Sequence, residues 1–262
     1  MRTMEKLMIY SKSMFEGSNP IKKFAEKNFS NIISKNNFLL FGSFLNMKNK
    51  IPYFLTEVNS EHHKDVKNIE KTRRIKGVKK ENLSLIVFDS HTDMYQKGEE
   101  KYPYIEKRIT MANWLTYMLS LKYSNIALVG VTDFTKSAPQ RKGFEYDSLD
   151  NKVSFFLGPK YNPQIDFKDY NGEIKLHSID EFFNLPLKEN SFISFDSDVS
   201  SDFTSMNQNF AGRLGGLTIE KSKEIIKHIK ENSNLIGFSF YGTFWDNSFR
   251  EESSNLLSLL NE

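Results

Sequence analysis

The chain has 262 residues, of which 39% are hydrophobic and 26% are charged, a composition that fits a globular protein with a substantial buried core. Its formal net charge of +3 is too small to indicate nucleic-acid binding, so we expect no nucleic-acid partner. The chain contains no cysteine, which excludes disulfides, thiolate metal sites and a cysteine nucleophile.

The N-terminal residues do not have the pattern of a targeting segment. Residues 1–13 are interrupted by Arg2, Glu5, Lys6 and Lys12 and lack the apolar stretch of a signal peptide. No apolar run in the chain reaches the length of a transmembrane helix. We therefore expect a cytoplasmic protein with no membrane partner.

Strand-like runs, rich in β-branched and aromatic residues, recur along the chain. Helical patterns fall between several of them, which is typical of a mainly parallel sheet with helices on both faces. We predict one α/β domain over residues 1–262, with three layers and about eight strands. The predicted strands are Phe38–Phe41, Tyr53–Val58, Leu83–Phe88, Ile126–Val131, Val153–Leu157, Ile174–His177, Phe192–Phe195 and Leu235–Tyr241.

One of the predicted helices lies in the most basic part of the chain, Lys64–Lys80. We interpret these charges as the solvated side of the helix, and a contact surface for an acidic partner is the alternative. The last helix is expected to have Thr218 as its N-cap and Glu220 in its first turn. The predicted helices are Ile21–Ile33, a basic helix after His63, Met111–Leu121 and Ile219–Ile229.

Two acidic segments stand directly after predicted strands. Asp89–Asp93, which reads Asp-Ser-His-Thr-Asp, follows Leu83–Phe88, and Asp196–Asp198, which reads Asp-Ser-Asp, follows Phe192–Phe195. In an extended segment, side chains two residues apart project to the same side, so the acidic and imidazole groups of each segment would converge. Parallel α/β sheets bind ligands at the carboxyl ends of their strands, so both segments are predicted to share one crevice.

The donor atoms of these segments favour a divalent metal ion. Unpaired carboxylates in close contact destabilise one another, because each negative charge makes ionisation of its neighbour more costly. Carboxylates with imidazole and no thiolate suit Mn²⁺ better than a structural Zn²⁺. The alternative is that each Asp caps the turn after its strand. Because two matched segments occur, we favour the metal site.

The two segments resemble the signatures of arginases and agmatinases, a superfamily of ureohydrolases. The family pattern is D-x-H-x-D followed by S-x-D-x-D-x-x-D; Asp89–Asp93 matches the first part, and Ser194–Asp202 follows the second with its last Asp one place late. A third landmark, a helix start of the type G-G-L-T-x-x-E, is echoed at Gly215–Glu220 with the Glu one place early. The resemblance implies an arginase-like fold and two divalent metal ions, which we expect to be Mn²⁺.

The family's remaining metal ligand is a His in a turn after an earlier strand. Here Asn59–His63 follows Tyr53–Val58, and His62 fits the register best, with His63 as the alternative. An exposed turn His would be the interpretation without a metal. Asp202 would be a supporting carboxylate. By resemblance, one metal would bind His62, Asp89, Asp93 and Asp196, and the other His91, Asp89, Asp196 and Asp198, with Asp89 and Asp196 as bridges.

Two departures distinguish the chain from ordinary arginases. Their last strand ends with a Glu that binds the substrate guanidinium, whereas Leu235–Phe244 contains no acid. Their G-N-x-H-G type loop, which supplies a proton-shuttling His, is replaced by Ile109–Leu115. With Glu61–His63, that segment resembles a divergent branch that includes peptide arginases, which convert arginine side chains in peptides to ornithine. Asn113 and Trp114 would otherwise be a helix-start polar group and a core aromatic.

The resemblance implies an Mn-dependent hydrolase that acts on a non-peptide C–N bond. The reaction would be hydrolysis at a guanidinium or amidine carbon by water activated between two metals, with Asp93 holding and relaying the proton. The substrate would be a small guanidino compound or an arginine-containing peptide. No substrate-binding residue is assigned, and the oligomeric state, including a homo-oligomer, is left open.

Two other functions are weighed against this one. A catalytically silent module could keep the metals for stability or for recognising a basic peptide; the missing guanidinium-binding Glu favours it, and retention of the candidate ligands argues against it. A metal-dependent amide hydrolase, related in fold to the deacetylases, is ranked last because their paired His motif is absent. His177 and His228 are interpreted as structural.

Overall fold

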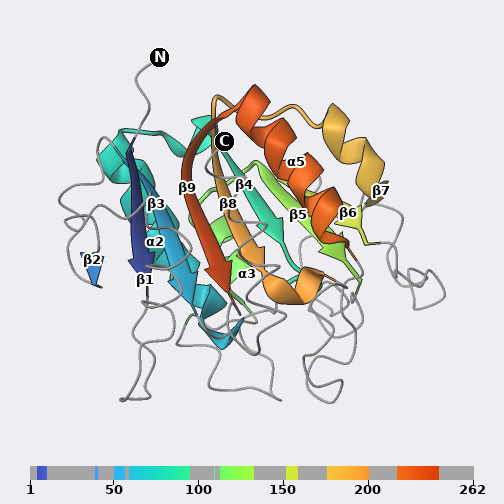
Figure 1. Cartoon of the computed structure of the whole chain (residues 1–262), viewed down its shortest axis with the longest axis horizontal. Helices are drawn as coiled ribbons and strands as arrows, with labels where there is room; N and C mark the ends of the chain where they lie inside the picture. Colours follow the sequence, from blue (N-terminus) through green and yellow to red (C-terminus); the bar gives the residue numbers. More distant parts are fainter. Residues whose placement is uncertain are drawn as a thin grey trace.

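The computed structural model contains a nine-stranded sheet within the residues that it describes, in the order β2-β1-β3-β9-β8-β4-β5-β6-β7 (Figure 1). Neighbouring strands pair in parallel throughout. The described residues are 5–10, 39–40, 50–56, 59–94, 109, 113–132, 152–158, 176–200 and 217–241. The strands are β1 Glu5–Tyr10, β2 Leu39–Leu40, β3 Lys50–Thr56, β4 Leu83–Phe88, β5 Ile126–Val131, β6 Val153–Leu157, β7 Leu176–Ser178, β8 Asn190–Asp196 and β9 Asn234–Tyr241.

The sheet confirms the predicted mainly parallel α/β architecture. The predicted bounds of β4, β5 and β6 match the structure residue for residue, and the other five predicted strands overlap strands with shifted ends. β1 is not predicted from the sequence, because it opens with Glu5 and Lys6 and lacks a clear alternation. It pairs with β3 along its length, from Glu5 opposite Lys50 to Tyr10 opposite Leu55. The predicted helix 21–33 lies outside the described residues.

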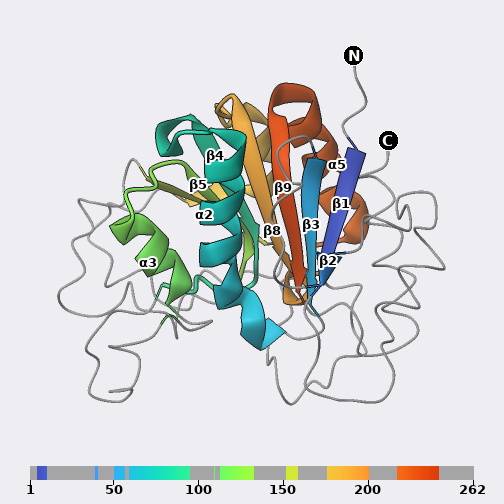
Figure 2. The same ribbon diagram turned by 90° about the vertical axis from the view of Figure 1, so that its left-hand side faces the viewer.

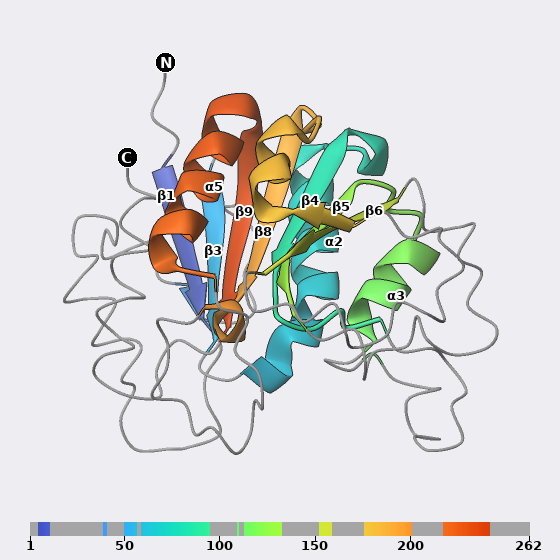
Figure 3. The same cartoon turned by 90° about the vertical axis from the view of Figure 1, so that its right-hand side faces the viewer.

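Helices cover both faces of the sheet. α2 (Asp65–Lys76) and α3 (Trp114–Ser120) lie on one face, and α5 (Ile219–Asn232) lies on the other (Figures 2 and 3). Thr218 caps α5 as predicted, because its side chain accepts a hydrogen bond from the Lys221 backbone N–H at 3.1 Å. These elements form the three layers that the alternation of strands and helices predicts.

Alternate residues of β4 enter two separate cores. Leu85 and Val87 pack in the core beneath α2 and α3, whereas Ile86 and Phe88 pack in the core beneath α5. This division follows from the period of two along a strand, and it explains why five of the six residues of β4 are apolar. The residue after Phe88 is Asp89, which continues the strand's direction to the carboxyl edge of the sheet.

None of the helices within the described ranges is long and apolar enough to cross a membrane.

A β-bulge in β9 reverses which face of the sheet its later side chains point to. The register between β8 and β9 shifts just before Gly237. Ile236 packs beneath α2 and α3, but Phe238, which has the same parity, packs beneath α5. Ser239 and Tyr241 therefore face α2, where both hydrogen-bond to its first residue. The bulge thus brings these two polar groups to the face of the sheet that α2 covers.

Gly130 lies at a second register shift, between Val129 and Val131 of β5. Its φ of 89° is in the left-handed region, and a Cβ there would overlap Val199. We expect Gly130→Ala to lower the free energy of unfolding by about 3–5 kcal/mol, because backbone strain and overpacking add. Denaturant unfolding would measure it.

The control for this substitution is Gly77, the C-cap of α2. Its φ is 70°, but a Cβ there would have no atom within 4 Å. Gly77→Ala should therefore carry the backbone cost alone, about 1–2 kcal/mol. Equal losses at Gly130 and Gly77 would contradict the overlap with Val199.

A network of ion pairs and hydrogen bonds connects part of the basic segment Lys64–Lys80 to Tyr123, which follows α3. Glu70 Oε2 lies 2.6 Å from Arg73 Nη2, and the Tyr123 hydroxyl donates to Glu70 Oε1 at 2.7 Å. Burial alone would raise the pKa of Glu70, but the hydrogen bonds from Arg73 and Tyr123 and the nearby charges of Arg73 and Lys80 outweigh it and lower the pKa to about 2. Some charges of this helix therefore form stabilising contacts within the protein, in addition to the solvated charges that the sequence predicted.

This lowered pKa predicts a loss of stability in acid. The charged form of Glu70 is favoured in the folded state, so its contribution is complete above the ordinary Glu pKa and is lost as the pH falls from about 4.5 to about 2. We expect Glu70→Gln to cost about 1–2 kcal/mol at pH 6, after allowance for solvent screening, and progressively less toward pH 2. A difference between the two proteins that stays constant with pH would contradict the charge assignment.

Candidate metal centre

The carboxyl ends of two neighbouring strands bring the acidic segments together. β4 and β8 pair in parallel up to Phe88 opposite Phe195, so Asp89 and Asp196 follow in adjacent positions at the edge toward which the arrowheads point in Figure 1. The short 3-10 helix η1 (Asn59–Lys64) carries His62 to the same edge. Three segments that are distant in sequence therefore meet in one place.

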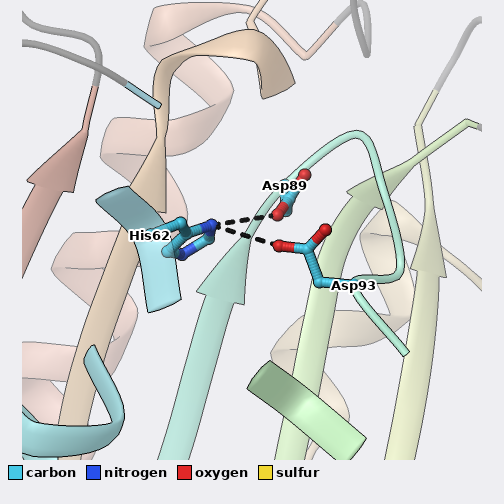
Figure 4. Close-up of side chains that lie close together, drawn as sticks. All are labelled: His62, Asp89 and Asp93. Carbon is cyan, nitrogen blue, oxygen red and sulfur yellow. Dashed lines mark ion pairs between the residues drawn. The ribbon is translucent and has the colours of Figure 1, made fainter. Parts of the chain in front are cut away.

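His62 is at the centre of the first group of donor atoms. Its Nδ1 lies 3.3 Å from Asp89 Oδ2 and 3.4 Å from Asp93 Oδ2 (Figure 4). These three side chains could hold one metal ion, since each offers a ligand atom close to the others. Nδ1 of His62 and Oδ2 of Asp89 are buried and have no hydrogen-bond partner among the described residues. Buried polar atoms seldom lack a hydrogen-bond partner, and a bound cation would provide a partner for both of these atoms.

Ser194 binds the other ring nitrogen of His62. The Ser194 Oγ lies 2.7 Å from His62 Nε2. With the proton on Nε2, the ring donates to Ser194 and directs the lone pair of Nδ1 toward Asp89 and Asp93. Ser194 is on β8, two residues before Asp196, so the strand that supplies an acidic segment also orients the imidazole.

Asp89 also belongs to a second group, with His91 and Asp198. His91 Nδ1 lies 2.8 Å from Asp198 Oδ2 and 3.4 Å from Asp89 Oδ1. The two oxygens of Asp89 therefore face different imidazoles, with Oδ2 toward His62 and Oδ1 toward His91. Asp89 is the residue that joins the two groups.

The segment Asp89–Asp93 is not extended, contrary to the geometry expected from sequence. Asp93 has a φ of 47°, so the backbone bends there into the left-handed region. Asp89 and Asp93 meet at His62, while His91 turns toward the second group. The bend distributes the segment over two groups of donors.

Asp196 lies beside the first group and is not part of either metal-capable group. Its Oδ2 is 3.5 Å from His62 Nδ1. Its Oδ1 accepts the Asp198 backbone N–H at 3.2 Å and thereby caps the short helix η7 (Ser197–Val199). The capping interpretation is thus correct for this residue, and the bridging role that the resemblance implied stays a prediction.

The electrostatics of the site favour added positive charge. Burial lowers the pKa of His62 and of His91, but the neighbouring carboxylates outweigh it and raise both pKa values well above the usual range. Burial, together with the charge of Asp89, raises the pKa of Asp93 to about 7. The site therefore holds protons that bound divalent cations would replace.

The other sequence-predicted residues lie elsewhere. His63 is partly buried and belongs to neither metal-capable group, so His62 is the imidazole that η1 brings to the acidic segments. His177 stacks on Phe156 with ring centroids 5.1 Å apart, and His228 packs against Phe183 at 5.3 Å. These contacts agree with structural roles for both.

The predicted supporting carboxylate, Asp202, lies outside the described residues, as do the glycines at 215 and 216.

Two aromatic residues that enclose His62 were not assigned to the site from sequence. Ring centroids of Trp114 and Tyr241 lie 4.7 and 4.8 Å from that of His62. The Trp114 indole N–H donates to Asp93 Oδ2 at 2.8 Å, and the Tyr241 hydroxyl donates to Asp65 Oδ1 at 2.7 Å. The Asn-Trp pair in the segment that replaces the family's loop is the sequence signal for Trp114. The bulge in β9 directs Tyr241 toward His62, and no local sequence pattern predicts that bulge.

No protein-family model matches the sequence. No curated protein matches it either. Solved structures do match over nearly the whole chain. The agmatine ureohydrolase of Thermoplasma volcanium is 16% identical with a TM-score of 0.55, over 98% of this chain and 88% of that one.

Two further structures match to a similar degree. A cold-adapted arginase from the psychrophilic yeast Glaciozyma antarctica is 14% identical with a TM-score of 0.53, over 98% of this chain and 94% of that one. The formimidoylglutamase of Bacillus subtilis is 14% identical with a TM-score of 0.52, over 97% and 85%. Identities this low establish the fold alone. The arginase-like fold implied by the sequence resemblance is confirmed, and the likeness to the peptide-arginase branch stays a prediction.

Proposed function

We propose that this chain is a dinuclear metal-dependent hydrolase that cleaves a guanidinium group and releases urea. The observation that carries the proposal is the pair of donor groups joined by Asp89, in which buried atoms of His62 and Asp89 face each other without hydrogen bonds. The arginase-like fold supports the same chemistry, since its solved neighbours include an arginase and an agmatine ureohydrolase.

The donors fit divalent cations. His62, Asp89 and Asp93 would hold one ion, and Asp89, His91 and Asp198 would hold the other. Oxygen and imidazole donors without thiolate suit Mn²⁺, which we propose as the metal. Two bound divalent cations supply a water of lowered pKa and offset the negative charge that develops at the reacting carbon.

The reaction balances with water as the only co-substrate. Water adds to the guanidinium carbon, the bond from that carbon to the substituted nitrogen breaks, and both protons of the water pass to the departing amine. We assign the proton transfer to Asp93, because its side chain is 13% exposed whereas that of Asp89 is 1% exposed. Asp89, enclosed between two imidazoles, holds the groups together.

The substrate is proposed to be arginine within a peptide, or another guanidino compound. β9 ends in Tyr241, whose ring lies beside His62, and none of the residues of the strand carries an acid. An acid at that position would bind a small free substrate tightly through its guanidinium, so its absence favours a substrate held through other parts of its structure. A peptide offers such contacts along its backbone.

The same observation favours one alternative, a metal-binding module without catalysis. β9 offers no carboxylate to a guanidinium, and such a module would bind cations and release no product. The partial exposure of the Asp93 side chain, at 13%, argues for catalysis, since a purely structural metal site is usually closed to water.

Urea release in the presence of Mn²⁺ tests these alternatives. The substrates would be arginine, agmatine, guanidinobutyrate and an arginine-containing peptide, with the lysine-containing peptide as the control. Urea and an ornithine-containing product from the arginine peptide alone would support the peptide substrate. Urea from a small compound would support the hydrolase and overturn the peptide assignment. Mn²⁺ binding without urea from any substrate would overturn catalysis in favour of the silent module.

A further inference from the structure

Trp114 contacts two candidate metal ligands, although its own side chain cannot bind a metal ion in this site. It is the first residue of α3, and its side chain is fully buried. The indole N–H donates to Asp93 Oδ2 at 2.8 Å, and the ring lies 4.7 Å from the ring of His62. A buried indole N–H normally has a hydrogen-bond partner, and here that partner is a carboxylate of the candidate site, which links the helix start to the donor group.

The oxygen that Trp114 binds is the one that faces His62. Asp93 Oδ2 lies 3.4 Å from His62 Nδ1 and accepts the indole N–H at the same time. A carboxylate oxygen has two lone pairs, so the indole occupies one and leaves the other for a cation. An indole is a neutral donor, which means that it orients the carboxylate without replacing the charge of a metal ion.

The backbone of α3 holds Asp93 a second time. The Leu115 N–H donates to the Asp93 carbonyl at 3.3 Å. Asp93 has a φ of 47°, a conformation that costs energy for a residue other than glycine. Two hydrogen bonds from consecutive residues of one helix thus stabilise the bend that directs the side chain toward His62.

We infer that Trp114 is a positioning residue for the candidate metal centre: with the start of α3 it holds the bend at Asp93 and directs Oδ2 into the group formed with His62 and Asp89. The inference rests on the proposed function, because it assigns to Trp114 the assembly of one of the two cation sites. It also gives the start of α3 a role in orienting a ligand.

Mn²⁺ binding to the full chain, measured by calorimetry, tests the inference with Trp114→Phe. Phenylalanine keeps an aromatic ring and removes the N–H. We expect the affinity of the His62 group to fall by about tenfold or more, as is usual when a partner of a metal ligand is removed. The affinity of the group with His91 and Asp198, to which Trp114 makes no hydrogen bond within the part of the chain that the structure describes, should stay within about twofold of wild type.

The control variant is Tyr117→Phe on the same helix, whose side chain is 41% exposed. It should bind Mn²⁺ as the wild type does. Unchanged affinity at both groups in Trp114→Phe would overturn the inference, and so would equal weakening of both, which would indicate general loss of structure. If the wild type itself bound no Mn²⁺, the proposed function would fail and the inference with it, so the two failures are distinguishable.

A second measurement leaves Trp114 in place. The chain contains two tryptophans, so Trp245→Phe leaves Trp114 as the only indole fluorophore. We expect the emission of Trp114 to change as Mn²⁺ binds to the first group of donors. In Asp93→Asn, the Mn²⁺ affinity reported by this change should fall by about tenfold or more. Emission that does not respond to Mn²⁺ in a protein that binds it would overturn the inference.

Discussion

Asp89→Asn should abolish binding of both cations and reduce urea release by roughly 10³-fold or more. Asp89 is the residue common to the two donor groups, with Oδ2 toward His62 and Oδ1 toward His91. Its loss removes a ligand from each ion at once, and two-metal stabilisation supplies several kcal/mol, of which about 4 kcal/mol corresponds to a thousandfold in rate. Metal analysis after dialysis and a urea assay would measure the two effects.

The matched control is Asp180→Asn, the same substitution at a surface position. The Asp180 side chain is 78% exposed and pairs with Lys221 at 2.7 Å. A surface pair contributes little to stability, so this variant should keep wild-type cation content and activity. Asp89→Asn that retained two cations would contradict the role of Asp89 as the shared ligand.

Asp93→Asn should lower turnover far more than it lowers stability. Asparagine keeps an oxygen that can accept the Trp114 indole N–H, so the local structure has the same hydrogen bond available. It removes the carboxylate that we propose takes and returns the proton, a contribution typically worth about 10²–10⁴-fold in rate. Rates at saturating Mn²⁺ separate this effect from weaker binding, and thermal unfolding reports the stability.

Two outcomes bear on this role of Asp93. A large loss of turnover at saturating Mn²⁺, with little change in thermal unfolding, is the result that we expect. Full activity with both cations bound would assign the proton transfer to another group.

The central strands could be predicted from sequence because burial on both faces leaves an unmistakable pattern. β4 is apolar except for Ser84 and β5 is an unbroken apolar run, and the predicted bounds of both are correct. The acidic segments were located for the same reason, since each stands at the carboxyl end of such a strand and parallel register places the ends together. β1 could not be predicted in this way, because its polar first residues give no such pattern.

The internal arrangement of the site could not be predicted, since it depends on backbone geometry that one residue can change. Asp93 departs from the extended conformation assumed for its segment, and this departure decides which donors share a cation. The bulge before Gly237 decides that Tyr241 faces His62. Trp114 was predicted as a core aromatic, which is correct for its ring, but its N–H contact follows from the path of α3 in three dimensions.

The number of Mn²⁺ ions bound per chain tests the central claim most directly. Equilibrium dialysis of the metal-free protein against Mn²⁺, followed by metal analysis, should give about two ions per wild-type chain, as in a two-metal hydrolase. The same measurement should give none for Asp89→Asn. A wild-type chain that binds no Mn²⁺ would contradict the assignment of these carboxylates and imidazoles to a dinuclear centre.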